Sequence, residues 1–559
     1  MNSLLTDIMA SILLILGAGS AEEVPEGEIE RFEQLSRCPI EINTASRSRL
    51  LSSGLFSEYQ VAALEDYRDR TGDILSLSEL SLVDGIGPDL ANALAPFISF
   101  ASSLAPGQRR SRRIKQSLML RASVRDKGSG EWAEGCKYQL AAGSSAELYW
   151  SFRNGYSASS ALPGTLSLAL YSRRGSRVIA GDFAARFGQG LLLWSGMSLS
   201  GFASAESFRR NASGFAPTGS FSSVFRGVAA DFPMGRWSLG GALFMEQSGK
   251  GSPVAAAPLF YALRMGRKGS FSLQAVKDGA SLSGVLGLGH WTLFGETALS
   301  SVICEREGAL VRKTRLAALC GTTWAPSYQM LFAALARYYP ADYHAPYAGA
   351  ARSASRVSDE AGLSLGARWH WAEMTLDCSA HPEKKAAHLK GILSLSPGFE
   401  FPKTQVATKL RLTERLRPQD RIPWRHELRV DVRASVKPSC SDEIIAAARV
   451  NVVLCRDFGA LAYAEAGHAS EGRIKLSEHL RFTVFRADSW DDRLYCYERD
   501  LPGVFSVPAY YKRGWAVSAV AGLRCRQRHS FFIKGSFLRY SAAVKPSVAE
   551  IKLQYQFKL

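Results

Sequence analysis

Apolar and polar residues alternate along most of the chain. Leu118, Leu120 and Ala122 are separated by Met119, Arg121 and Ser123, and downstream Leu428, Val430 and Val432 alternate with Arg429 and Asp431. Successive side chains of a strand point to opposite faces, so each such segment has one apolar and one polar face. The pattern predicts a long series of amphipathic strands.

The alternation continues to the last residue. Ile551, Leu553, Tyr555, Phe557 and Leu559 alternate with four polar residues, which are Lys552, Gln554, Gln556 and Lys558. This pattern predicts a final strand with one apolar face that ends at the terminus.

The extent of the pattern decides between two kinds of β protein. Residues 117–559 show it without a helical interlude, whereas a soluble β unit of that size would divide into several domains. In a membrane barrel the apolar face meets lipid and the polar face meets a wet lumen, so no second sheet is needed. We therefore predict a mainly β fold, a large transmembrane antiparallel β-barrel of roughly 14 to 24 strands. Aromatic residues near strand ends are expected to form interfacial girdles; they are Trp369, Trp371, Tyr510, Tyr511 and Trp515.

A different period precedes the barrel. Within residues 37–100 the apolar positions recur at helical spacing, and Ser57 with Gln60 forms a capping-box pattern at the start of a helix. Pro88 suits the first turn of another helix, which would run to about Phe97. The segment predicts a small all-α domain ahead of the barrel.

The beginning of the chain predicts export. Ile8–Leu16 is an apolar block that is too short to span a bilayer but long enough for a signal-peptide core, and Gly19-Ser20-Ala21 supplies small residues for cleavage. We expect a signal peptide at residues 1–21 and an acidic mature N-terminus at residues 22–36.

Charge is distributed unevenly. The chain has 559 residues and a net charge of +17, yet residues 37–100 contain five Arg against nine acidic residues and are net negative. The positive charge therefore belongs to the C-terminal part. The nine cysteines are scattered without paired spacing, which predicts no disulfide framework.

A basic linker is expected at residues 101–116, between the helical domain and the barrel. Its cations are Arg109, Arg110, Arg112, Arg113 and Lys115. Such a run fits a solvated tether, a phosphate contact or attraction to anionic lipid.

Several short stretches of the helical segment carry a resemblance to a known family. Ile42-Asn43-Thr44-Ala45, Asp66-Tyr67-Arg68, Val83-Asp84-Gly85-Ile86-Gly87 and Pro96-Phe97-Ile98 follow one another in order, and over about 60 residues the segment resembles the tandem helix-hairpin-helix domain of the competence protein ComEA family. The resemblance implies that Gly85, Ile86 and Gly87 form a turn whose amides bind DNA phosphates, with Gly54 in the equivalent first hairpin. The first hairpin has Phe56 where the second glycine belongs, and Asp89 stands where a basic residue is usual.

The barrel also carries resemblances. Ile179–Phe183 and Phe187–Leu191 resemble Bacteroidota-type proteins that join such a module to a barrel. The final strand resembles the terminal strand of outer-membrane barrels, which implies that Tyr555, Phe557 and Leu559 are read by the barrel-assembly machinery. Gly188-Gln189-Gly190 lacks the third glycine of a dinucleotide loop and is expected in a glycine-bearing strand or an inward loop.

Catalytic and metal motifs are not evident. Cys378, His381 and His388 have poor spacing for a metal site and are expected in a polar hairpin loop, and no nucleophile elbow, Walker loop or zinc-protease motif occurs. We predict no enzyme, no cofactor and no metal.

These patterns combine into two functional hypotheses for a bacterial outer-membrane protein with its module in the periplasm. The first is binding or uptake of DNA, or of another polyanion, across the outer membrane. The alternative is a structural or assembly component whose module docks a periplasmic protein or plugs the barrel. Expected partners are outer-membrane lipid and lipopolysaccharide, the barrel-assembly machinery, DNA, and a periplasmic protein.

Overall fold

The computed structural model describes most of the chain. The described residues are 31–32, 35–36, 39–45, 47–100, 114–127, 130–142, 145–156, 162–172, 176–195, 202–219, 225–234, 237–247, 253–265, 269–306, 309–401, 403–438, 442–470, 474–504, 506–525, 528–541 and 547–559. The predicted signal peptide, most of the acidic N-terminus and four of the five linker cations lie outside these ranges.

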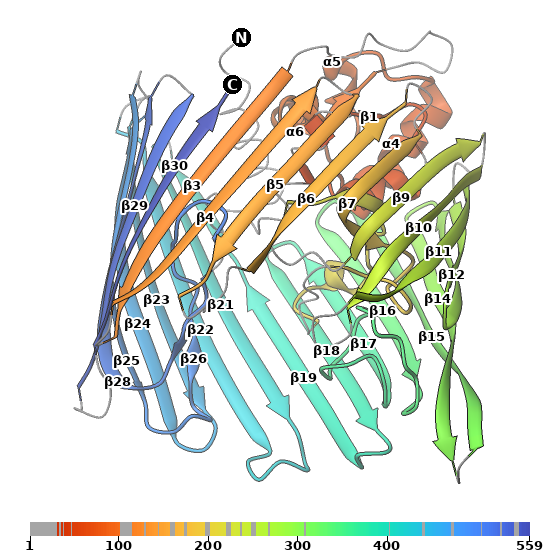
Figure 1. Cartoon of the computed structure of the whole chain (residues 1–559). Helices are drawn as coiled ribbons and strands as arrows, with labels where there is room; N and C mark the ends of the chain where they lie inside the picture. The colour runs from red at the N-terminus through yellow and green to blue at the C-terminus, as the bar shows by residue number, and fades with distance from the viewer. Residues whose placement is uncertain are drawn as a thin grey trace.

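The dominant element is a closed antiparallel barrel of 24 strands, at the upper limit of the predicted range. Each strand pairs with its neighbours in the chain, and β30 closes the ring against β3 (Figure 1). The strands are β3 (Ile114–Asp126), β4 (Gly130–Ala142), β5 (Ala146–Asn154), β6 (Leu162–Tyr171), β7 (Arg177–Arg186), β9 (Phe225–Met234), β10 (Trp237–Gln247), β11 (Pro253–Met265), β12 (Gly269–Val276), β13 (Gly279–Leu288), β14 (Trp291–Arg306), β15 (Ala309–Ser327), β16 (Met330–Tyr339), β17 (Glu360–Trp369), β18 (Ala372–His381), β19 (Ala386–Leu395), β21 (Thr404–Leu416), β22 (Trp424–Val436), β23 (Asp442–Leu454), β24 (Phe458–Ser470), β25 (Ile474–Ala487), β28 (Lys512–Cys525), β29 (His529–Tyr540) and β30 (Val548–Lys558). Two short strands add to the wall, β8 (Gly214–Pro217) on β7 and β20 (Gly398–Phe401) on β21.

The two faces of the wall differ as the alternation predicts. On β22 the side chains of Leu428, Val430 and Val432 are exposed on the outside, while Arg429 and Asp431 form an ion pair on the other face. An apolar exterior and a polar interior are the properties of a barrel that spans a membrane. The chain therefore forms a transmembrane β-barrel of the outer-membrane type.

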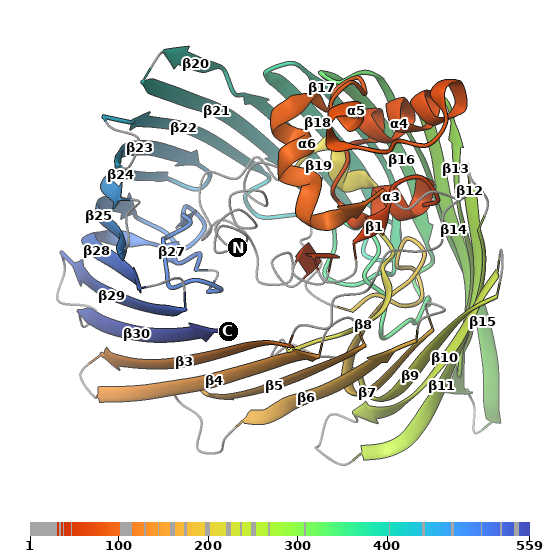
Figure 2. The same cartoon turned by 90° about the horizontal axis from the view of Figure 1, so that it is seen from above.

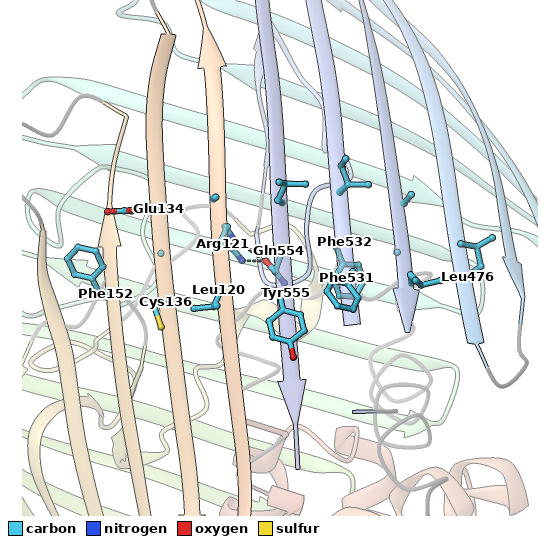
Figure 3. A pocket seen from close by; sticks show the side chains of 17 residues that line it. Leu120, Arg121, Glu134, Cys136, Phe152, Leu476, Phe531, Phe532, Gln554 and Tyr555 are labelled. Atoms are coloured by element: carbon cyan, nitrogen blue, oxygen red, sulfur yellow. Dashed lines mark hydrogen bonds between the residues drawn. The ribbon is translucent and has the colours of Figure 1, made fainter. Parts of the chain in front are cut away.

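The barrel closes at the seam between β3 and β30, the first and last strands of the ring. Arg121 on β3 donates two hydrogen bonds to Gln554 Oε1 on β30, of 2.9 and 2.6 Å, on the inner face (Figure 3). A hollow of about 710 Å³ lies at this seam, and its lining is dominated by apolar residues such as Leu120, Phe531 and Leu553. It therefore lacks the clustered charges that a polar solute would need.

The two ends of the barrel are different. At the end where β3 begins and β30 finishes, which we call the terminal end, the strands are joined by tight connections such as Gly289-His290 and Tyr328-Gln329. At the opposite, loop end, three connections are long: residues 187–224, 340–359 and 488–511. Described parts of all three pack against the inner wall.

The helical segment forms a small domain at the terminal end (Figures 1 and 2). The parallel pair β1 (Ile40–Glu41) and β2 (Ile98–Ser99) brings its two ends together. Its helices are α3 (Arg47–Ser53), α4 (Glu58–Thr71), α5 (Leu77–Leu80) and α6 (Gly87–Leu94), followed by the 3-10 turn η2 (Ala95–Phe97). The predicted capping box of Ser57 and Gln60 is present at the start of α4. The domain has its own apolar core, which includes Leu50, Leu64, Leu80 and Phe97.

Several details differ from the sequence-based expectation. Tyr510 is only 5% exposed and lies in β27 (Ala509–Tyr510), which pairs with β26 (Leu494–Tyr495) inside the barrel, so its assignment to an aromatic girdle is wrong. Tyr511 is half-buried beside Trp490. Trp369 and Trp371 are exposed at the terminal end, as expected for a girdle. Strand β3 already begins at Ile114, so Lys115 belongs to the barrel wall and not to the linker.

Within the described ranges, none of the helices combines the length and apolarity that crossing a bilayer requires. The cysteines whose state is described are free thiols: Cys136, Cys320, Cys378, Cys455, Cys496 and Cys525.

Candidate functional site

The interior of the barrel is the candidate site, because it contains both the helical domain and the long inward segments. Seen from above, the helices lie inside the outline of the barrel and cover one side of its opening, next to the wall from β12 to β15 (Figure 2). Two polar residues at the starts of α3 and α4 hold the domain there.

Arg47, at the start of α3, makes the first contact. Its side chain is 1% exposed, pairs with Glu65 of α4 at 2.9 Å, and donates a 3.2 Å hydrogen bond to Thr292 Oγ1 on β14. Gly287 on β13 provides the space, because a Cβ atom there would lie 2.2 Å from Cδ of Arg47. The observed conformation of the Arg47 side chain therefore depends on the absence of a side chain at Gly287.

Glu58, at the start of α4, makes the second contact. One carboxylate oxygen accepts a 2.7 Å hydrogen bond from Thr292 Oγ1, and the other lies 2.8 Å from both Nε and Nη2 of Arg209. The side chains of Glu58 and Arg209 are 10% and 8% exposed. Breaking a buried pair by removing one partner costs about 3–5 kcal/mol, since it leaves an uncompensated charge.

Tyr59 adds an aromatic contact next to Glu58. Its ring stacks on His290 of the β13–β14 turn, with 5.5 Å between ring centroids. Its hydroxyl donates to Asp84, and this hydrogen bond raises the pKa of Tyr59 to about 12. The phenol therefore stays neutral and keeps donating at physiological pH.

Arg209 belongs to the inward segment between β7 and β9, which is held by apolar packing. Leu191, Phe202 and Phe208, the last from the 3-10 turn η3 (Ala205–Phe208), are buried against wall residues such as Phe294 and Leu335. In the same segment the backbone N–H groups of Gln189 and Leu191 donate to Glu296 on β14, at 2.6 and 3.0 Å. The run Gly188-Gln189-Gly190 thus lies in an inward loop, one of its two predicted locations.

A second inward segment, residues 488–511, is held by apolar packing of Leu494 and Tyr510 against the wall and also by charge. Asp500 lies 3.0 Å from Nζ of Lys534 and 2.7 Å from Nζ of Lys552, both on the wall. Burial alone would raise the pKa of Asp500, but the attraction of these two ammonium groups outweighs it and holds the pKa below the ordinary value. Asp500 is therefore a carboxylate at neutral pH.

The predicted DNA-binding turns are partly covered. A methyl group added at Gly85 would lie 3.1 Å from the Tyr59 ring and 3.3 Å from the ring of Tyr328 on the barrel, and one added at Gly54 would meet the guanidinium of Arg31. Gly87 has open space around it, and Ile86 is buried in the core of the domain. Gly54, Gly85 and Gly87 all have positive φ, as tight turns require.

Cys378, His381 and His388 lie on β18 and β19 and not in the expected hairpin loop, and only the two histidines come close together. Cys378 is exposed on β18, whereas His381 is buried and lies 3.2 Å from His388 across the β18–β19 hairpin. Among the residues that the structure describes, no group of three His, Cys, Asp or Glu side chains could hold a metal ion. Tyr555, Phe557 and Leu559 lie along the outward face of the closing strand, and their role in assembly stays a prediction.

Sequence reasoning missed Arg47, Glu58 and Arg209, the residues that dock the helical domain. Nothing in their local sequence distinguishes them from solvated charges at helix starts and in loops. Their function depends on Gly287 and Thr292, which lie far along the chain.

Comparison with known proteins leaves the chain without a family. No protein-family model matches it, and no curated protein matches it. Solved structures match at low similarity. An Escherichia coli P pilus tip assembly intermediate, PapC-PapD-PapK-PapG, has 10% identity and a TM-score of 0.48, and the match covers 83% of this chain and 63% of that chain.

Two further barrels match over nearly their whole length. The translocation pore of the P pilus usher PapC has 12% identity and a TM-score of 0.40, over 80% of this chain and 99% of that chain. Pseudomonas aeruginosa OccK11 (OpdR) has 10% identity and a TM-score of 0.30, over 80% and 96%. None of these matches supports the ComEA resemblance, a Bacteroidota origin or DNA uptake.

Proposed function

We propose that the chain is a channel of the bacterial outer membrane whose periplasmic mouth is narrowed by the helical domain, acting as a detachable plug. The observation that carries this proposal is the position of the domain inside the barrel outline, docked through Arg47 and Glu58. This is the plug form of the alternative hypothesis drawn from the sequence.

The orientation is supported by the lengths of the connections. Outer-membrane barrels have short periplasmic turns and longer extracellular loops. The terminal end has the short turns and the helical domain, and the loop end has the three long connections. We therefore assign the terminal end, with the domain, to the periplasm.

Detachment is supported by the kind of contacts at the interface. The domain has a complete apolar core of its own, and its described contacts with the barrel are mainly the Glu58–Arg209 ion pair and hydrogen bonds with Thr292. Polar interfaces between domains permit relative motion, whereas large apolar ones do not. Undocking would leave both the domain and the barrel folded.

DNA binding by the domain is the weaker candidate. Its second hairpin carries Asp84 and Asp89, its Gly85 lies against Tyr328, and binding to a phosphate backbone requires cations. Substitution of Gly85 and Gly87 by Asp should abolish DNA binding by the full chain if this role exists. The other expected partners stay predictions.

Single-channel conductance in planar bilayers tests the plug. Glu58→Arg places two cations in contact with each other and should raise the conductance or the fraction of time spent open. The charge-swapped double variant Glu58→Arg, Arg209→Glu re-forms the ion pair and should restore most of the closed behaviour. Equal conductance of all three proteins would refute the plug, and so would a double variant that is no better than Glu58→Arg.

A further inference from the structure

The inner face of β19, β21 and β22 carries cations in directly opposed positions. Lys390 faces Arg415, and Arg415 faces Arg425, so three neighbouring strands place a cation in one row. In a second row nearer the terminal end, Arg411 faces Arg429. Like charges directly opposite each other on neighbouring strands are destabilising.

Three of these cations have no acidic partner. Among the described residues, no carboxylate lies within 4.0 Å of Lys390, Arg411 or Arg415. The nearby acids are engaged elsewhere: Asp377 lies 2.8 Å from Nη2 of Arg337, and Glu427 accepts a 3.1 Å hydrogen bond from Asn451.

Ion pairs between cations and carboxylates are common elsewhere in this lumen. Arg337 has a fully buried side chain and pairs with Glu360 at 2.6 Å, Arg499 pairs with Glu465 at 2.6 Å, and Lys534 pairs with Asp500 at 3.0 Å. The half-buried Lys390, Arg411 and Arg415 therefore place positive charge together without a described carboxylate within 4.0 Å.

A cavity lies over the two rows. Its volume is about 380 Å³. Cations outnumber carboxylates in its lining: Lys390, Arg411, Arg415, Arg417, Arg425 and Arg429 against Asp377 and Glu427. This volume is within the range of small-molecule sites. Guanidinium groups bind carboxylates and phosphates through two parallel N–H···O bonds, so several around one cavity suit a solute with more than one oxyanion group.

We infer that this cavity is a binding site for small solutes with two or more carboxylate or phosphate groups, and that such polyanions are the cargo of the channel. The inference rests on the proposed channel function and names its substrate class. Lys390 and Arg415 lie near the loop end, and Arg411 and Arg429 lie deeper. A solute entering from the loop end would meet the rows in that order, and the focused positive field would raise its local concentration.

Equilibrium binding to the purified full chain in non-ionic detergent tests the site. Calorimetric titration with pyrophosphate and with citrate, against acetate as a monovalent control, separates phosphate from carboxylate recognition. We expect one or both polyanions to bind, and acetate to bind at least about tenfold more weakly. A preference for either polyanion supports the site and assigns its chemistry.

The double variant Arg411→Gln, Arg415→Gln should weaken that binding at least about tenfold. This double variant should fold, because it removes repulsion between like charges. The single variant Lys390→Gln tests the site independently and should lose less affinity for the polyanion. Lys409→Gln is the matched control, because Lys409 is another inward cation of β21 but does not line the cavity. Absence of polyanion binding, or a loss as large in Lys409→Gln as in the double variant, would overturn the site.

These outcomes are separate from those of the plug experiment. If neither polyanion binds while Glu58→Arg still raises conductance, the cargo site is wrong and the plugged channel stands. If the polyanions bind but no Glu58 or Arg209 variant changes conductance, the site stands and the plug is wrong.

Discussion

The helical domain and the inward segment between β7 and β9 occupy the same side of the lumen, but different forces hold them. The inward segment buries Leu191, Phe202 and Phe208 in a core shared with the wall. The apolar core of the helical domain contains only the domain's own residues. Its described contacts with the wall and the inward segment are mainly polar, apart from the ring of Tyr59. Apolar burial is lost only when the shared core opens, whereas a polar contact can be exchanged for water at moderate cost.

This difference indicates a division of roles. In the proposed channel, the inward segment is the fixed lining that presents Arg209, and the helical domain is the part that detaches from it. Three predictions test this division and a fourth tests the other inward segment, in order of decreasing effect.

Phe208→Ala should have the largest effect on stability. Phe208 is 1% exposed within the shared core, and truncation of a buried Phe costs about 3–5 kcal/mol. We expect a lower midpoint of denaturant unfolding in detergent. Leu82→Ala, at a residue that is 73% exposed on the helical domain, is the control and should leave the midpoint unchanged. An unchanged midpoint in Phe208→Ala would mean that the shared core does not fix the lining.

Glu58→Ala should free the helical domain without unfolding the barrel. Loss of one partner of the buried pair costs about 3–5 kcal/mol, which shifts the docked population by two decades or more. Hydrogen exchange should accelerate at the starts of α3 and α4 and stay slow in the barrel strands. Arg70→Ala breaks only the exposed pair with Asp66, so exchange should not change. Acceleration throughout the barrel would contradict separate bodies.

Gly287→Ala should weaken docking from the barrel side. The new methyl group would overlap Arg47 and force it away from Thr292, at a cost of about 1–3 kcal/mol. The same exchange measurement should show a smaller acceleration in α3 than Glu58→Ala produces. Gly391→Ala on β19 is the matched control, since its Cβ would meet no atom within 4 Å. Equal behaviour of the two glycine variants would exclude Gly287 from the docking site.

Acidification has the smallest expected effect of the four changes. It should leave the segment 488–511 in place. The lowered pKa of Asp500 means that its stabilising ion pairs are fully present above the ordinary Asp value of about 3.9 and are lost only as the pH falls through the lowered pKa. Limited proteolysis of this segment should therefore be the same at pH 7 and pH 5. Asp500→Asn should increase cleavage at both. Release of the segment at pH 5 in the unchanged chain would contradict this assignment.

The sequence predicts the barrel because lipid outside and water inside impose a period of two on every spanning strand. The capping box of Ser57 and Gln60 is likewise a local signal, and it is present in the structure. Tyr510 shows where such reasoning fails: it resembles a girdle residue locally, yet it lies in a segment that folds into the lumen. The docking of Arg47 depends on the absence of a side chain at Gly287, a tertiary coincidence that no local pattern encodes.

The net charge of the sequence does not show which cations form ion pairs and which do not. Many lumen cations, such as Arg337, are neutralised by acids on neighbouring strands. Only the pairing register showed that Lys390, Arg411 and Arg415 lie together without carboxylates among the described residues. The sequence predicted a basic barrel, but not which of its cations are available to a solute.

The distance between the helical domain and the barrel rim tests the detachable plug most directly. Spin labels carried by unnatural amino acids at Leu82 on the domain and at Gln329 in the β15–β16 turn would report this distance in pulsed electron paramagnetic resonance. We predict one narrow distribution for the otherwise unaltered chain, a broad distribution at longer distances for Glu58→Arg, and a return of the narrow one when Arg209→Glu is added. The same narrow distribution in all three proteins would show that the domain is a fixed part of the barrel and would contradict the account.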